Sequence, residues 1–165
     1  MAKDLFNYLF SSYFQSFSDL IFFIRIGVIS SIISILPAAL YGVLFYNYPS
    51  RISKNYIGWL GVCVGTGGCV LLGTSNSAGL PAFLFMIAAF IAGGFLPGFA
   101  WKSKGLIVPP LLAAIAAVFA ITNPRQSYFG NALIPISFIV VFSMAMTAAV
   151  MAILIGRRKG HPREI

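Results

Sequence analysis

The sequence has very few groups that could carry acid–base or metal chemistry. Of its 165 residues only Asp4, Asp19 and Glu164 are acidic, and His161 is the single histidine. None of these lies inside a long apolar run. General acid–base catalysis needs positioned titratable groups, and metal or haem sites need ligands that are clustered or buried. We therefore expect a non-enzymatic chain with no cofactor and no metal; a membrane enzyme would need an active site supplied by a partner.

Charged residues of either sign are scarce. They make up 8% of the chain, whereas 59% is hydrophobic, and a soluble domain carries about 25% charged residues. A water-facing surface cannot be built from this supply, so we expect lipid to be the solvent. The net charge of +8 does not indicate nucleic acid, because the basic residues lie at the ends of apolar runs and form no stripe. Their expected partners are anionic lipid headgroups.

Cysteine is also scarce. Cys63 and Cys69 lie six residues apart in one apolar run. Six residues of helix rise about 9 Å and turn through about 600°, so the two thiols point to different faces and are too far apart for a disulfide. We expect two small buried residues, which say nothing about a redox compartment.

Long apolar runs are what the chain does have. Five of them look long enough to cross the hydrocarbon, which takes about 20 residues, although the second and fourth are short. They are too long and too uniformly apolar for barrel strands. The predicted fold is a single all-α membrane domain, a polytopic transmembrane helical bundle. Its predicted spans are residues 26–46, 57–73, 80–100, 106–121 and 133–155.

The basic residues occupy alternate gaps between these runs. The gap 74–79 has no basic residue, and the gap after the fourth run has only Arg125. Lys and Arg near span ends stay on the cytoplasmic side. We therefore expect an integral membrane protein, typical of a bacterial inner membrane, with its N-terminus outside and the basic tail 156–165 in the cytoplasm. The basic residues that set this orientation are Arg51, Lys54, Lys102, Lys104, Arg157, Arg158, Lys159 and Arg163.

The N-terminal segment has a different pattern. Large apolar residues recur every three or four positions in residues 5–24, and polar residues fill the opposite face. This pattern predicts an amphipathic helix with an aromatic side. We interpret residues 1–24 as an interfacial helix that lies at headgroup level. The alternative is a sixth span, which would place the N-terminus inside.

Small residues and prolines form the next signal. Gly61, Gly65 and Gly68 share one face of the second run, and this spacing lets two helix backbones approach closely. The stripe could pack within the monomer or form a subunit interface. Prolines inside runs remove backbone hydrogen bonds and tend to kink helices, and broken helices are a feature of transport sites. The candidate kinks are Pro37, Pro97, Pro109, Pro110 and Pro135, although Pro109 and Pro110 could simply begin a helix.

From Tyr56 onward the order of spans and charges resembles the membrane domain of the fusaric acid resistance and aromatic acid exporter family. The matching features are the glycine-rich span Gly58–Gly65, the basic loop around Lys102, a span that ends at Pro124, and a last span that runs into Arg157. Arg25 before Ile26 is similar to the arginine that opens that family's first span. The match covers about two-thirds of the chain, but the family has another full span between Arg25 and Arg51. The resemblance implies efflux of small amphipathic acids and assigns no functional residue.

Two functional hypotheses remain from the sequence. The first is a non-enzymatic component of a transport or efflux assembly for small amphipathic molecules. Its path would be lined by Ser, Thr and aromatic side chains, with Arg25 as an anion contact or as a residue that only snorkels to the interface. The second is an accessory or structural subunit that packs against a larger membrane complex. Membrane lipids are expected partners in both cases, together with further copies of the chain or other membrane subunits.

Overall fold

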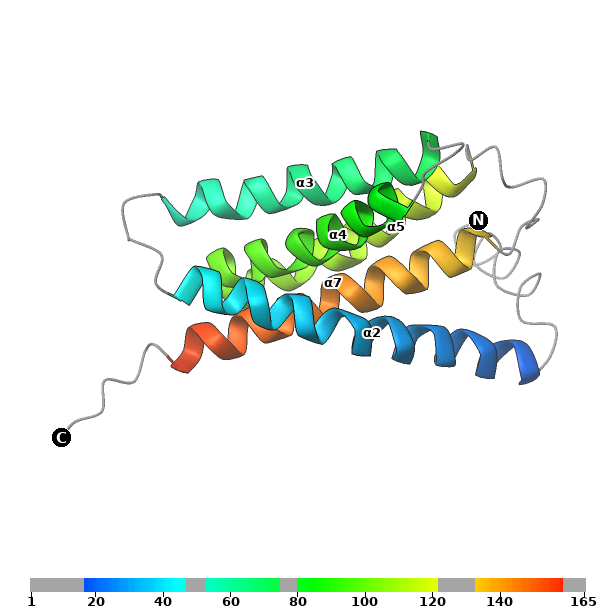
Figure 1. The fold of residues 1–165 in the computed structure, drawn as a ribbon, viewed down its shortest axis with the longest axis horizontal. Coiled ribbons are helices and arrows are strands. Elements are labelled where there is room, and N and C mark those ends of the chain that lie inside the picture. The colour runs from blue at the N-terminus through cyan, green and yellow to red at the C-terminus, as the bar shows by residue number, and fades with distance from the viewer. Residues whose placement is uncertain (1–16, 47–52, 75–79, 122–132, 159–165) are drawn as a thin grey trace, which may run out of the picture.

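The computed structural model describes residues 17–46, 53–74, 80–121 and 133–158. These residues are almost entirely helical, and no strand occurs among them. The elements are α2 (Phe17–Tyr46), α3 (Lys54–Thr74), α4 (Leu80–Trp101), the 3₁₀ helix η1 (Lys102–Ile107), α5 (Val108–Ile121) and α7 (Leu133–Arg158). Figure 1 shows them as a bundle of long helices packed side by side.

Four stretches in the described part of the chain are long and apolar enough to cross a membrane. They are Ile21–Phe45, Lys54–Thr74, Leu80–Ile121 and Leu133–Gly156. This confirms the expected all-helical class and indicates an integral membrane protein. The expected third and fourth spans fall in one of these stretches, because α4, η1 and α5 follow one another without a break. Alone, α5 has 14 residues, a length of about 21 Å.

Close contacts between helices give the directions of the elements. Gly58 meets Trp101 and Gly68 meets Ala89, so α3 and α4 are antiparallel. Gly65 meets Leu112 and Gly73 meets Phe119, so α5 runs parallel to α3 and returns along α4. In the contacts of α4 with α7, and of α2 with α7, the residue numbers increase together in both helices. These three helices are therefore parallel. The pairs that show this are Gly94 with Ala145, Gly98 with Ala149, Gly27 with Ser143, and Gly42 with Ile155.

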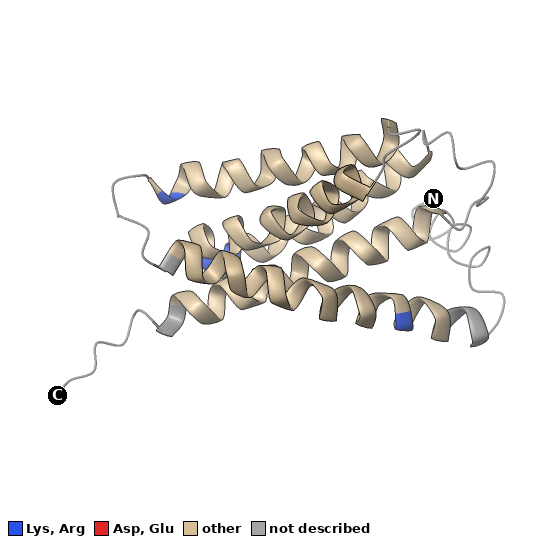
Figure 2. Ribbon diagram, in the orientation of Figure 1, with Lys and Arg blue, Asp and Glu red and all other residues tan. Residues whose placement is uncertain are grey.

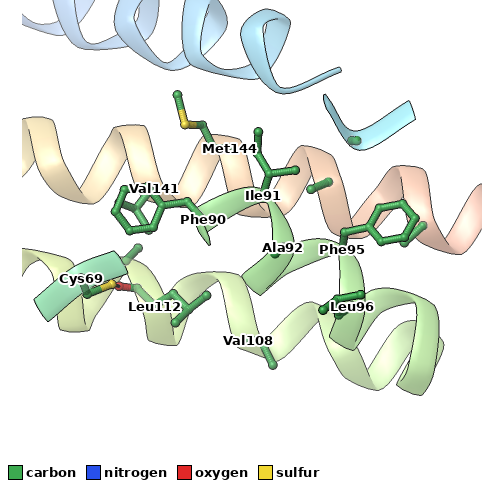
Figure 3. Close-up of a cluster of buried hydrophobic side chains, with 14 of the residues drawn as sticks. Cys69, Phe90, Ile91, Ala92, Phe95, Leu96, Val108, Leu112, Val141 and Met144 are labelled. Carbon is green, nitrogen blue, oxygen red and sulfur yellow. Dashed lines mark hydrogen bonds between the residues drawn. The ribbon is translucent and has the colours of Figure 1, made fainter. Parts of the chain in front are cut away.

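The core is centred on α4. Every residue from Ala89 to Gly98 is buried, because α3, α5 and α7 pack around this segment (Figure 1). Its glycines and alanines let the neighbouring backbones come close, and its larger side chains fill the spaces between helices. Figure 3 shows Phe90, Ile91, Phe95 and Leu96 of α4 among Leu112 of α5 and Val141 and Met144 of α7.

The outside of the bundle is strongly apolar. Much of α2 consists of large hydrophobic side chains with half or more of their surface exposed, such as Leu36 (70%) and Val43 (72%). Soluble monomers rarely expose a contiguous apolar patch above a few hundred Å². In a bilayer the same surface contacts lipid chains, so the exposed faces agree with the expectation that lipid is the solvent.

Two expectations change in the structure. Residues 17–24 belong to the same helix as the first expected span. No proline lies between Phe17 and Pro37 that could end a helix there, and the helix continues past Pro37 to Tyr46. Residues 1–16, the rest of the expected interfacial segment, lie outside the described residues. The expectation that both cysteines are buried is wrong for Cys63, which is exposed, whereas Cys69 is buried. The reason is that α3 is an outer helix, and Cys63 lies on its outward face.

Candidate functional site

Buried hydroxyl groups gather on the helix α2 and on its neighbour α7. The buried polar side chains of the described residues are Ser30 and Ser34 on α2 and Ser137 on α7. Gly27 of α2 lies against α7, since a Cβ there would be 3.2 Å from the Oγ atom of Ser143. Residues 27, 30 and 34 share one helix face. We define the hydroxyl seam as Gly27, Ser30, Ser34 and Ser143, whereas Ser137, six residues before Ser143, lies on another face of α7.

The hydroxyls of the seam are satisfied inside the bundle. The Oγ atom of Ser34 donates to the carbonyl oxygen of Ser31, one turn earlier in α2, at 2.7 Å. No buried side-chain nitrogen or oxygen atom of the described residues lacks a hydrogen-bond partner. Serine hydroxyls can exchange such intrahelical bonds for bonds to another polar group. The seam can therefore accept a polar ligand group without first breaking an ion pair.

Pro37 weakens α2 next to the seam. It lies inside the helix, lacks an N–H group and leaves the carbonyl of Ile33 without its usual intrahelical donor. Such carbonyls are tolerated at membrane depth where protein groups or a water-filled space satisfy them. The freed carbonyl of Ile33 is next to Ser34 in the chain. This turn of α2 therefore lacks one backbone hydrogen bond and also holds a buried hydroxyl. It is the part of the helix where bending costs least.

An aromatic cluster lies between α2 and α4, toward the end where both helices finish. The ring centroids of Tyr41 and Phe95 are 5.8 Å apart, and those of Phe45 and Phe99 are 6.1 Å apart. Phe95 and Phe99 stack with centroids 6.2 Å apart and planes inclined by 9°. Aromatic pairs at these distances add about 0.5–1.5 kcal/mol beyond their buried area. The cluster fixes the C-terminal half of α2 on α4.

Arg25 does not line the seam. It is exposed, and at about 100° per residue it points away from the face of Phe23 and Gly27, both of which lie toward the bundle. The expectation that Arg25 is an anion contact in a path lined by serines therefore finds no support in the geometry. Its exposure on an apolar helix face agrees with the alternative, a side chain that snorkels toward the interface.

The glycine stripe of α3 is an internal packing surface. Gly61 faces Leu96 and Pro97 of α4, and Gly68 faces Ala89 and Phe90. Gly65 lies between the Leu112 side chain of α5 and the Gly93 backbone of α4. All three glycines are buried within one chain. Of the two uses expected for this stripe, the structure shows packing within the monomer, and the stripe is not on the surface for a second subunit.

The prolines expected to kink helices fall into two groups. Pro37 and Pro97 lie inside α2 and α4. Pro109 and Pro110 lie in the first turn of α5, and Pro135 lies in the first turn of α7. First-turn N–H groups have no intrahelical acceptor, so proline removes nothing there. The structure therefore favours the alternative of a helix start for Pro109 and Pro110, and Pro135 has the same position in α7.

Cys69 joins α3 to α5. Its Sγ atom donates to the carbonyl oxygen of Leu112 at 3.5 Å, and Figure 3 shows the two residues next to each other. The described residues contain no group of three or more His, Cys, Asp or Glu that could hold a metal ion. This cysteine has a structural contact to another helix, which fits its place in the core.

The hydroxyl seam was not singled out from the sequence. Its signal was present, since Gly27, Ser30 and Ser34 recur at three and four positions in an otherwise aliphatic run. Such a polar stripe predicts a buried face, but serines are common in this chain and nothing marked these ones. No family model, curated protein or solved structure significantly matches the chain. The likeness to the aromatic acid exporter family therefore rests on the order of spans and charges alone.

Proposed function

We propose that the chain crosses a bacterial inner membrane five times, with its C-terminus in the cytoplasm. The return arm of η1 and α5 supports this, because six 3₁₀ residues and 14 α-helical residues together reach about 33 Å. In Figure 2 the basic positions at the start of α3 and after α4 lie at the end of the bundle where α2 and α7 finish. Basic residues at that end favour a cytoplasmic location.

We propose further that the chain is a non-enzymatic component of a transport assembly for small amphipathic molecules. The observation that carries this proposal is the hydroxyl seam, with Ser30 and Ser34 buried in the middle of a long apolar helix. Buried polar groups at membrane depth are costly and are commonly functional. An amphipathic molecule would place its polar group against the serines and its apolar part against the aromatic cluster.

Opening of the seam would involve α2. This helix touches the rest of the bundle through one face, which consists largely of small residues such as Gly27 and Ala38, and its outer face is exposed. Pro37 lies beside Ser34 and lowers the cost of a bend. The resemblance to aromatic acid exporters supports small acids as one cargo class. The basic end of the bundle would attract such anions from the cytoplasm.

Cysteine accessibility tests the seam. A Ser34→Cys variant should react with a small water-soluble thiol reagent in membranes, and amphipathic compounds that enter the seam should slow the reaction. Ala116→Cys is the matched control, since Ala116 is fully buried in α5, outside the seam, and it should stay unlabelled. Labelling is located by peptide mass spectrometry in the otherwise native chain. An inert Ser34→Cys, like the control, would contradict a route through the seam.

A second candidate function is an accessory subunit of a larger membrane complex. The long apolar outer face of α2 favours it, because Ile32, Leu36 and Val43 are each more than 60% exposed and offer an unbroken surface to another membrane helix. Purification in mild detergent separates the candidates. Copies of this chain alone, without other proteins, support transport by a homo-oligomer. Other chains recovered in fixed stoichiometry support the accessory role.

A further inference from the structure

Two tryptophans join the first turns of α3 to the end of α4. The ring centroids of Trp59 and Trp101 are 5.6 Å apart in an edge-to-face arrangement. Gly58 makes this contact possible, because a Cβ at that position would overlap the Trp101 ring. Trp59 is still 61% exposed, and Tyr56, one turn earlier, is 74% exposed. Exposed aromatic rings at helix ends are typical of the headgroup level of a membrane.

Three lysines lie at the ends of the helices that carry this tryptophan pair. Lys54 begins α3, and Lys102 and Lys104 follow Trp101 directly in η1. All three are exposed, and α3, α4 and η1 contain no acidic residue. Figure 2 shows the basic positions of α3 and η1 at the same end of the bundle. The three elements that form this corner therefore carry positive charge with no carboxylate of their own to neutralise it.

Lys102 occupies a backbone position that favours glycine. Its φ is 54°, and it is the one described residue other than glycine with a positive φ. An L-residue with a Cβ is destabilised by about 1–2 kcal/mol in this region, and asparagine or glycine is usual there. Gly105, three residues later, lets η1 pack on the Pro97 carbonyl of α4. The turn thus has a glycine where packing needs it and a lysine where the backbone conformation disfavours one.

We propose that this corner binds an anionic phospholipid, and we name it the lysine–tryptophan corner: Lys54, Trp59, Trp101, Lys102 and Lys104. The lysine ammonium groups would bind the lipid phosphate, and the exposed face of Trp59 would contact the glycerol and the first part of an acyl chain. A soluble phosphate would use the lysines but gain nothing from the aromatic face. The combination therefore selects a lipid. This site does not depend on the transport role proposed for the seam.

The composition of the chain makes the site directly observable. Trp59 and Trp101 are the only tryptophans in the sequence, so all tryptophan fluorescence reports on this corner. The protein is reconstituted in phosphatidylcholine vesicles, and brominated phosphatidylglycerol or brominated phosphatidylcholine is added as a quencher. The site predicts that the anionic lipid is preferred by at least about five-fold, the effect of one lysine at an anionic surface. Equal quenching by the two lipids would overturn the proposal.

Variants separate a local site from a general surface potential. The triple variant Lys54→Gln, Lys102→Gly, Lys104→Gln keeps the tail cations Arg157 and Arg158 and should lose most of the preference. An unchanged preference would overturn the proposal, because cations outside the corner would then be its source. Arg25→Gln, near the other end of α2, is the matched control and should quench like the original chain; a loss of preference there would also contradict the site.

Two further measurements test whether the ligand is a soluble anion and whether the triple variant keeps its fold. Inorganic phosphate added in excess should leave the quenching by brominated phosphatidylglycerol unchanged at matched ionic strength. Full competition by phosphate would overturn the lipid assignment in favour of a soluble anion. Thermal unfolding of the triple variant should remain cooperative, which separates a lost site from a lost fold. If it does not, the single variant Lys54→Gln, in the first helical turn of α3, carries the same test with a smaller expected loss.

Discussion

Gly65 of α3 and Gly93 of α4 lie backbone against backbone. A Cβ on Gly65 would be 3.0 Å from the Cα atom of Gly93, and a Cβ on Gly93 would be 2.9 Å from the Cα atom of Gly65. The Leu112 side chain of α5 covers both positions, at 2.8 Å from the first Cβ and 2.7 Å from the second. Three helices therefore meet where two of them have no side chain. Dispersion contacts of this kind are what hold helices together in lipid.

A methyl group at this point should destabilise the protein. Gly65→Ala should lower the free energy of unfolding by about 1–3 kcal/mol, because Gly93 is backbone and cannot move aside as a side chain can. Thermal unfolding in detergent measures the change. The matched control is Gly67→Ala, two residues along the same helix, where a Cβ would meet nothing within 4 Å. That variant should be neutral or gain up to about 1 kcal/mol from the better helix propensity of alanine.

Equal effects of the two alanine variants would contradict the packing of α3 on α4. The comparison also bears on assembly. A stripe that held subunits together would change the oligomeric state of Gly65→Ala at unchanged stability of each subunit. Since Gly65 is buried within one chain, we expect the loss to appear in unfolding of the subunit instead.

The two cysteines should differ sharply in reactivity. Cys63 is exposed on the outside of α3, whereas Cys69 is fully buried and donates to the Leu112 carbonyl at 3.5 Å. In detergent, a small membrane-soluble maleimide should label Cys63 within minutes and leave Cys69 unmodified until the protein unfolds. Peptide mass spectrometry before and after denaturation measures both. Modification of Cys69 at the same rate as Cys63 in the folded protein would show that α3 and α5 are not packed as described.

At Lys102 a substitution by glycine should raise the stability of the protein, the opposite of its usual effect. Substitution of an exposed residue by glycine normally destabilises, because the unfolded chain gains freedom. Lys102 has a φ of 54°, so Lys102→Gly removes strain and should stabilise the protein by about 0.5–1 kcal/mol. Lys104→Gly is the control in the same 3₁₀ helix and should destabilise by about 0.5–1 kcal/mol. Thermal unfolding of the two variants measures both changes. A Lys102→Gly variant less stable than the original chain would contradict the positive φ of Lys102.

Much of the fold could be predicted from hydropathy alone. Each expected span, from residues 26–46 to residues 133–155, lies within or largely within a helix of the structure, because hydrophobic length in a membrane protein is set by the bilayer. The close spacing of Gly61, Gly65 and Gly68 also correctly marked a packing face. Sequence could not tell which neighbour that face meets, since glycine stripes serve contacts within and between subunits equally well.

Other features of the helices could not be predicted from the sequence. The exposure of Cys63, the outward direction of Arg25 and the first-turn position of Pro135 all depend on where a helix begins and which side meets its neighbours. The sequence of a uniformly apolar helix does not show which side is buried, because the lipid-facing side and the core-facing side are equally apolar. The hydroxyl seam could not be predicted from the sequence for the same reason. Its serines became distinctive only when the structure placed Ser30 and Ser34 on the face of α2 that packs on the bundle.

The direction of α3 tests the five-span arrangement most directly. Ser53 precedes α3, Thr74 ends it, and Ser103 lies in the turn after α4; all three are exposed. With Cys63 replaced by alanine, each is changed in turn to cysteine. A membrane-impermeant maleimide should label Thr74→Cys in intact cells, and Ser53→Cys and Ser103→Cys only after the cells are opened. The physical reason is that α3 and α4 each cross the membrane once, in opposite directions, so Ser53 and Ser103 share a side. Labelling of Ser103→Cys in intact cells together with Thr74→Cys would mean that α4 does not cross, and the return arm through α5 could not complete a fifth span.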